Sequence, residues 1–370
     1  MPRISDSISI KAKKMSFLAM LAVVALHTYP FNGIANSNGA VLFTQNFLLR
    51  NLTCFPVSYF FMASGFFFAE RFKDVPFKEL FSIKSHNGYI SLVQGKIKTL
   101  AVPYLLWGFV GTAILLPLLM LHNCLHGHEI FQGTVLGTHG LFNKIDMIFG
   151  IFAQYPATYG HLWFVKTLFA IFLIAPILSG LAKSSKWILP AIGILLLFAL
   201  PQNNFKQVPV MIAPNNIGFF ILGMAVAHLG LSQLKVNCIL KFACFIGYAG
   251  IGIYRSWPSG VLGEQIVPHA TIQIQRLCAI IFLWSICSEE PAKGNVRDSC
   301  LNMTFWVYCI HGCLLPWPSA IVAYLMEKSD MREIVTSLVA VLFTLFAGFG
   351  IGFFLKKRLP RVYSAMSGGR

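Results

Sequence analysis

The chain has 370 residues, of which 56% are hydrophobic and only 11% are charged, and its mean hydropathy is +0.68. Soluble domains carry about 25% charged residues, so this chain lacks the polar side chains needed to cover a water-soluble core. The formal net charge is +16, but with no soluble basic domain to carry it, nucleic-acid binding is the weaker interpretation. The composition therefore predicts an all-α, polytopic membrane protein, with the lipid bilayer as its main surroundings.

Apolar segments long enough to cross a bilayer recur along the chain. A membrane-spanning helix needs about 20 predominantly apolar residues. We predict ten spans, at 16–35, 52–70, 98–121, 162–182, 187–203, 212–231, 238–255, 270–288, 302–325 and 332–355. The first resembles a signal peptide, but Tyr29-Pro30-Phe31 stands where a cleavage site of small residues is expected, so we keep it as a helix. The whole chain, 1–370, is predicted to form one membrane domain with two long loops, 71–97 and 122–160.

The basic residues predict the orientation of these spans. With ten spans and both termini on one side, 21 of the 29 lysines and arginines fall on that side, 6 fall on the other, and Lys166 and Arg276 lie within spans. Basic residues accumulate on the cytoplasmic side of membrane proteins. Both termini and loop 71–97 are therefore predicted to be cytoplasmic, and loop 122–160 external.

Ionisable side chains inside the predicted spans are the candidates for function, because a bilayer makes them costly to bury. His27 lies near the middle of the first predicted span, and His311, Lys166 and Arg276 lie in others. No carboxylate lies in mid-span, which argues against a proton-coupled transporter. At a rise of about 1.5 Å per residue, His27, His311 and Ser64 fall at similar depths. We therefore hypothesise that these three side chains converge on a central pocket.

Five short sequence blocks stand out along the chain. They are the apolar stretch ending in Val-Val-Ala-Leu-His27, the segment Phe55-Pro-Val-Ser-Tyr-Phe-Phe-Met-Ala-Ser-Gly65, the run Lys96-Ile-Lys98 leading to Pro103-Tyr104, the block His161-Leu-Trp163-Phe164, and Tyr308-Cys-Ile-His311. In type and order these blocks resemble those of the membrane acyltransferase type 3 family, which includes O-acetyltransferases of cell-surface polysaccharides. One position departs from the family: many members carry an arginine eleven residues before the first histidine, where this chain has Ser16.

This resemblance implies acyl transfer from a cytoplasmic acyl-CoA, usually acetyl-CoA, to a hydroxyl of an envelope polysaccharide or lipid-linked glycan in the plasma (inner) membrane. A hydroxyl needs a general base in order to attack a thioester, and histidine suits that role. We predict His27 as the base, with Ser64, His311 or Arg276 stabilising the oxyanion. An acyl-histidine intermediate is the alternative to direct attack. The predicted substrate-binding residues are His161, Trp163, Lys166 and Arg276, and the predicted CoA-binding residues are Lys13, Lys14, Arg71, Lys96 and Lys98.

Each of these residues also has a purely structural interpretation. Interhelical hydrogen bonds would explain the histidines, an aromatic belt would explain Trp163, and snorkelling would explain Lys166 and Arg276. Ser64-Gly65 would also suit close helix packing. The alternative function is a transporter or flippase for a glycan, lipid or small acid.

Two further features are weak candidates for a metal site or a disulfide. The motif His122-Asn-Cys124-Leu-His126-Gly-His128 does not have the spacing of a closed zinc site, so no metal is predicted. A disulfide between Cys54 and Cys124 is the weaker interpretation of those two cysteines.

Overall fold

Every regular element in the described part of the chain is a helix. The computed structural model describes residues 5–28, 39–76, 88–125, 127–153, 159–185, 187–199, 213–231, 235–257, 269–291, 294–327 and 329–369. The first half contains α1 (Asp6–His27), α2 (Gly39–Gln45), η1 (Asn46–Asn51), α3 (Pro56–Phe72), α5 (Tyr89–Lys96), η2 (Ile97–Ala101), α6 (Val102–Leu125), α7 (Leu141–Phe149), η3 (Gly160–Leu162) and α8 (Trp163–Ser184). The second half contains α9 (Ile188–Phe198), α10 (Pro214–His228), α11 (Cys238–Ser256), α13 (His269–Ile286), α14 (Asn295–Asn302), α15 (Thr304–Leu314), α16 (Pro316–Leu325), α17 (Asp330–Arg358) and α18 (Pro360–Ser367).

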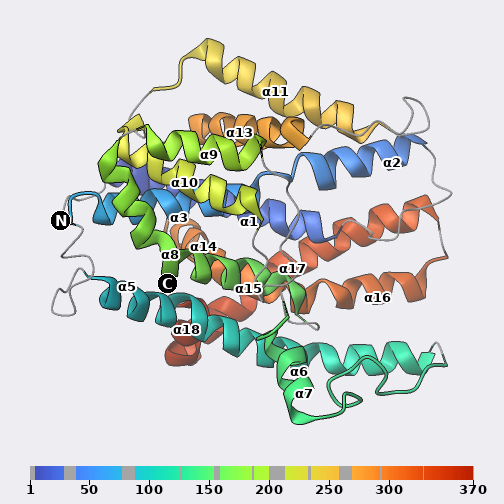
Figure 1. Cartoon of the computed structure of the whole chain (residues 1–370). Coiled ribbons are helices and arrows are strands. Elements are labelled where there is room, and N and C mark those ends of the chain that lie inside the picture. The colour runs from blue at the N-terminus through green and yellow to red at the C-terminus, as the bar shows by residue number, and fades with distance from the viewer. Residues whose placement is uncertain are drawn as a thin grey trace.

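Helices occupy most of the residues of the predicted spans. Most of the long helices run roughly along one direction (Figure 1). Within the described residues, seven helical segments are long and apolar enough to cross a membrane, and they begin at Gly39, Tyr89, Gly160, Cys238, His269, Thr304 and Arg332. Each of the other three predicted spans overlaps a helix, namely α1, α9 or α10. The all-helical membrane class is therefore confirmed, whereas the count of ten spans and the orientation of the termini stay predictions.

Three boundaries differ from those expected from the sequence. Helix α1 begins ten residues earlier than the predicted span and ends at His27, while residues 29–35 of that span lie outside the described residues. The predicted loop 71–97 contains helix α5, which runs on through η2 into α6. The predicted span 302–325 is divided into α15 and α16 at Leu315, directly before Pro316.

Local sequence explains where several helices begin. Side chains of Ser5, Asn237 and Ser329 accept hydrogen bonds from backbone N–H groups in the first turns of α1, α11 and α17, as N-cap residues do. Prolines stand at the starts of α3, α10, α16 and α18, where the missing N–H costs no hydrogen bond. The π-helical turn η2 lies just before Pro103. Because proline has no backbone N–H, one hydrogen bond of the helix is missing at that point.

Helices α3 and α10 pack with their backbones in direct contact. A Cβ atom on Gly65 would overlap the carbonyl oxygen of Phe220, and a Cβ atom on Gly223 would overlap that of Met62. Small residues permit this kind of approach between membrane helices. The aromatic side chains of α3 then continue the contact into α8, where Phe61 and Phe164 lie 4.9 Å apart between ring centroids.

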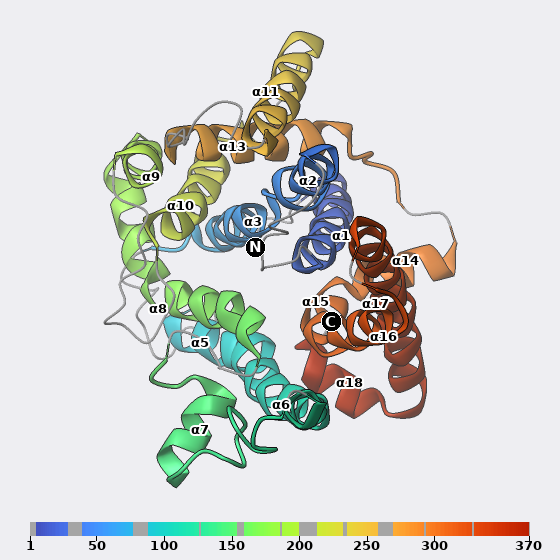
Figure 2. The same cartoon turned by 90° about the vertical axis from the view of Figure 1, so that its right-hand side faces the viewer.

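The C-terminal helix α18 closes back onto the bundle. The indole Nε1 of Trp107 in α6 donates to the carbonyl oxygen of Met366 at 2.9 Å, and the rings of Trp306 and Tyr363 lie 5.2 Å apart. The start of α1 and the helix α18 lie in the same half of the molecule, on the left in Figure 1. Seen end-on, the helices surround the central α1, α3 and α15 (Figure 2).

Candidate active site

Three histidines from distant parts of the sequence form one cluster. His27 is the last residue of α1, His161 lies in η3 at the start of α8, and His311 lies in the last turn of α15. The ring centroid of His311 is 5.0 Å from that of His27 and 4.4 Å from that of His161, while the centroids of His27 and His161 are 6.5 Å apart. We call these three residues the histidine centre. It joins two of the three groups expected to converge and adds His161, which the sequence suggested only as a substrate-binding residue.

Backbone carbonyls determine which ring nitrogens of two of these histidines carry hydrogen. The Nδ1 atom of His311 hydrogen-bonds the carbonyl oxygen of Tyr308, and the Nε2 atom of His161 lies 3.2 Å from the carbonyl oxygen of Cys309. A carbonyl oxygen only accepts, so each of these nitrogens is the donor, and the other nitrogen of a neutral ring keeps a free lone pair. His311 therefore presents Nε2 as a proton acceptor and not as a donor.

Two ring nitrogens in the centre lack partners in the described part of the chain. They are Nδ1 of His27 and Nε2 of His311, both buried. His311 itself is completely buried, and none of the hydrogen bonds recorded for the three histidines involves a carboxylate. A buried polar atom without a partner costs free energy, and a catalytic role is one explanation for keeping such an atom. Nε2 of His311 is thus a buried nitrogen that is free to accept a proton, and Nδ1 of His27 is a second buried nitrogen with no partner in the described residues.

Tyr159 and Gly312 position His161, and sequence inspection missed both. The Tyr159 ring lies 4.1 Å from that of His161, and its hydroxyl donates to the carbonyl oxygen of Cys309 and accepts from the thiol of Cys313. A Cβ atom on Gly312 would overlap the His161 imidazole. The dipeptide His311-Gly312 was a weak signal for this, since a glycine beside a functional residue often admits another group.

Tyr308, Ser64 and Trp163, three further residues of the sequence blocks, differ in how they relate to the histidine centre. Tyr308 donates from its hydroxyl to the carbonyl oxygen of His161 at 2.7 Å and so connects α15 to η3. Ser64 is partly buried, and no recorded contact joins it to the histidines. Trp163 packs beside Phe164. Their roles in oxyanion stabilisation and substrate binding stay predictions.

The Lys166 side chain hydrogen-bonds the protein backbone. Its ammonium donates to the carbonyl oxygens of Gly150, Ile151 and Ala153, at 3.3 Å for Ile151 and 2.9 Å for Ala153. These carbonyls follow the end of α7. The contacts explain Lys166 as a structural link between α7 and α8, and a role in substrate binding stays a prediction.

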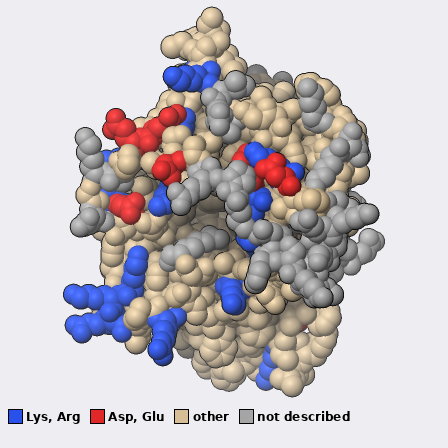
Figure 3. All heavy atoms as spheres, turned by 90° about the vertical axis from the view of Figure 1, so that its left-hand side faces the viewer, with Lys and Arg blue, Asp and Glu red and all other residues tan. Residues whose placement is uncertain are grey.

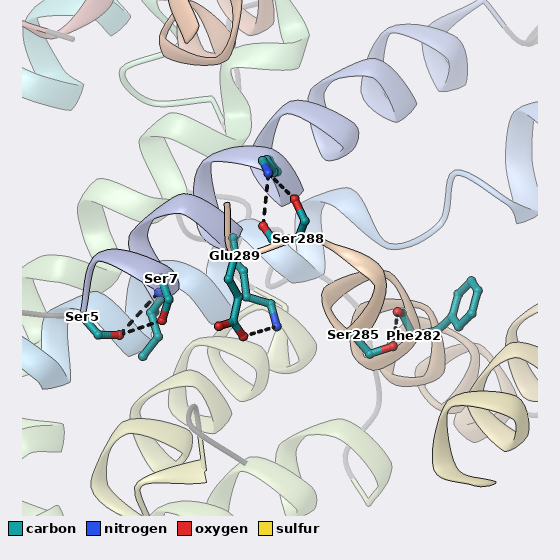
Figure 4. A network of polar contacts seen from close by, with 9 residues as sticks. Ser5, Ser7, Phe282, Ser285, Ser288 and Glu289 are labelled. Atoms are coloured by element: carbon teal, nitrogen blue, oxygen red, sulfur yellow. Dashed lines mark hydrogen bonds and ion pairs between the residues drawn. The ribbon is translucent and has the colours of Figure 1, made fainter. Parts of the chain in front are cut away.

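The predicted CoA-binding residues are divided among α1, α3, α5 and η2, and some of them have partners within the chain. Lys14 donates to the side chain and backbone of Ser288 and to the backbone of Glu290, and the neighbouring ion pair of Lys11 with Glu289 is visible in Figure 4. The Lys96 ammonium lies 3.6 Å from the centre of the Phe172 ring. Lys13, Arg71 and Lys98 are exposed. Figure 3 shows basic side chains distributed over the end of the molecule at which α1 begins.

The other candidate sites do not gain support from the geometry. Among the described residues, no group of three histidine, cysteine, aspartate or glutamate side chains is arranged to hold a metal ion. All nine cysteines are free thiols, so Cys54 and Cys124 are not joined.

The geometry thus defines a helical membrane protein with a buried imidazole centre. A family model described as an acyltransferase domain matches residues 17–357, which include all three histidines. The chain therefore belongs to the membrane acyltransferase type 3 family. No curated protein and no solved structure matches it.

Proposed function

We propose that this protein transfers an acyl group, in the first instance acetyl, from a cytoplasmic acyl-CoA to a hydroxyl of an envelope polysaccharide or lipid-linked glycan. The observation that carries the proposal is the pair of buried, unpartnered ring nitrogens, Nδ1 of His27 and Nε2 of His311. Membership of the acyltransferase family supports the reaction class. The donor, the acceptor and the inner-membrane location are parts of the proposal.

The proposed reaction needs one proton to move from the acceptor to the leaving group. The acceptor hydroxyl gives its proton to His27 as its oxygen attacks the thioester carbonyl. A C–O bond forms, the C–S bond breaks, and the proton then goes to the departing CoA thiolate. General acid–base catalysis of this kind contributes about 10²–10⁴-fold in rate.

His311 supports this reaction as an acceptor and not as an oxyanion donor. Because its Nδ1 hydrogen is engaged by Tyr308, a neutral His311 has no hydrogen on Nε2 to offer an oxyanion. Its Nε2 lone pair suits a second proton acceptor, which takes the proton from a protonated His27 or replaces His27 as the base. An acyl group carried on a histidine nitrogen stays the alternative route.

The test is thiol release from acetyl-CoA by the purified protein in lipid nanodiscs, with an envelope-glycan extract as acceptor. We expect acceptor-dependent release in the wild type and a loss of about 10²–10⁴-fold in His27→Ala. His139→Ala is the matched control, because His139 is exposed and lies outside the histidine centre. Release that persists in a folded His27→Ala variant would remove His27 from the reaction. Absence of release with any acyl-CoA, in folded protein and with several extracts, would favour the transporter alternative.

A further inference from the structure

Three arginines gather where α11 ends and α13 begins. Arg255 lies in the last turn of α11, Arg276 lies two turns into α13, and Arg50 lies in η1, which packs against both α11 and α1. Gln275 hydrogen-bonds both the Arg255 side chain and the Asn51 carbonyl oxygen, and its chain neighbour is Arg276 just as that of Asn51 is Arg50. We call these residues the arginine cluster. The end of α11 lies in the half of the molecule opposite the start of α1 (Figure 1).

A buried polar network holds Arg255 in place. Its NH1 group donates to Oε1 of Gln275 at 2.6 Å, and Nε2 of Gln275 donates to the carbonyl oxygen of Asn51 at 3.1 Å. The Asn51 amide in turn donates to the hydroxyl of Ser256 at 2.8 Å. Gln275, Asn51 and Ser256 are buried. The network therefore fixes the end of α11, the start of α13 and η1 relative to one another.

Arg276 has most of its hydrogen-bonding capacity unused. A guanidinium has five N–H donors, and the recorded hydrogen bond of Arg276 is a long one, 3.4 Å from NH1 to Oε1 of the neutral Gln273. Its Nε atom is buried and has no partner. Gln273 is itself completely buried, with its amide nitrogen 2.7 Å from Nε2 of His269. Arg276 is thus an oriented, incompletely bonded cation.

No carboxylate compensates these charges in the part of the chain that the structure describes. The ion pairs recorded there join Lys11 to Glu289, Lys73 to Glu70 and Arg332 to Glu333. Burying a guanidinium without an anion costs free energy, and the cost is larger within a membrane. A bound anion would satisfy both the charge and the free N–H groups.

We propose that the arginine cluster binds a phosphate or pyrophosphate group of the acceptor. This inference rests on the proposed acyl transfer and names the chemistry by which the acceptor is held. Guanidinium groups bind phosphate oxygens through paired N–H donors, and three of them match a multiply charged anion better than the single charge of a carboxylate. Because η1 contacts both α11 and α1, an acceptor held here lies beside the helix that ends in His27.

The binding test needs no acyl donor, so its outcome is independent of whether acyl transfer occurs. The probe is radiolabelled pyrophosphate, added to purified protein in phosphatidylcholine nanodiscs. We expect Arg276→Gln and Arg255→Gln each to weaken binding by about tenfold or more. Arg276→Lys is expected to weaken it less, since lysine keeps the charge but lacks the fork. Arg297→Gln is the matched control, because Arg297 is exposed on α14.

Arg50→Gln keeps the test valid if the buried variants do not fold. Arg50 is exposed, so its substitution disturbs packing least, and we expect roughly threefold weaker binding.

Addition of phosphatidic acid to the nanodiscs distinguishes two sources of the phosphate. Displacement of pyrophosphate supports a lipid-linked phosphate, whereas binding without displacement supports a phosphate on the glycan.

Two results would overturn the proposal. The first is equal pyrophosphate binding by the wild type and by folded Arg255→Gln, Arg276→Gln and Arg50→Gln variants. The second concerns Glu264, which the sequence places between α11 and α13 and which lies outside the described residues. Binding that rises about tenfold in Glu264→Gln would mean that the chain supplies its own anion. Unchanged binding in Glu264→Gln supports the proposal.

Discussion

At the level of single residues, the histidine centre depends on small neighbours as much as on the imidazoles. Gly312 leaves the space that the His161 ring occupies, and the Tyr159 ring packs against that same His161 ring. His161 in turn lies against His311. A change at Gly312 therefore reaches the proposed proton acceptor through one intervening side chain.

Gly312→Ala is expected to lower turnover strongly without unfolding the protein. The added methyl group displaces the His161 imidazole, and misplacement by about 1 Å near reacting groups can cost about 10²-fold. The measurement is acceptor-dependent CoA release alongside a thermal unfolding curve. Gly350→Ala is the control, because a Cβ atom there meets nothing within 4 Å. Equal turnover in the two variants would show that His161 is not positioned by Gly312.

His311→Gln is expected to abolish the base function of this side chain while preserving most of its packing. Glutamine places an amide near the position of Nε2, but an amide cannot take a proton at neutral pH. We expect a loss of about 10²-fold or more in the rate of single-turnover CoA release. Donor binding should stay within about twofold of the wild type. Retention of the full rate would leave His27 as the sole base.

The sequence identified the histidines better than it identified their arrangement. His27, His161 and His311 all stood out as polar groups in apolar or interfacial segments, but helical phase was unknown, so the contact between His161 and His311 was not predictable. The partners of Lys166 and Lys14 also escaped prediction. Most of these partners are backbone carbonyls in other segments of the chain, and carbonyls leave no mark in the amino-acid pattern.

At the level of elements, the crossing of α3 and α10 is the tightest contact between backbones near the site. It orders the helix that carries Ser64 and, through Phe61 and Phe164, the start of α8. The helices themselves were largely predictable from hydropathy. The boundaries were less so, because α1 begins with charged residues that a hydropathy pattern assigns to water.

Gly223→Ala is expected to destabilise the bundle through this crossing. The new Cβ atom would overlap the Met62 carbonyl oxygen, and overpacking of this kind costs about 1–3 kcal/mol. The measurement is the midpoint of thermal unfolding in detergent, with Gly250→Ala in α11 as the control, since open space surrounds that position. A midpoint equal to that of the control would show that α3 and α10 can separate without penalty.

At the level of the whole molecule, the predicted orientation makes opposite ends of the bundle chemically distinguishable. Cys238 and Cys124 are free and exposed, at the start of α11 and near the end of α6. The distribution of lysine and arginine predicts that the first faces the cytoplasm and the second faces outward.

A membrane-impermeant thiol reagent added to intact cells is therefore expected to label Cys124 and to spare Cys238. The two single-cysteine proteins, each carrying alanine at the other eight cysteine positions, serve as controls for one another. Permeabilised cells should show both sites labelled. The reverse pattern in intact cells would invert the topology and, with it, the side from which the acyl donor arrives.

No carboxylate contact is recorded in the histidine centre. This bears on whether the membrane voltage can change the rate of the proposed reaction. Neutral imidazoles that pass one proton from a hydroxyl to a thiolate return to their starting state, so a catalytic cycle moves no net charge through the bilayer. A voltage acts on a reaction only through displaced charge, at about 2.3 kcal/mol per elementary charge and 100 mV. The enzyme should therefore work at the same rate in energised and in fully depolarised vesicles, driven by the thioester alone.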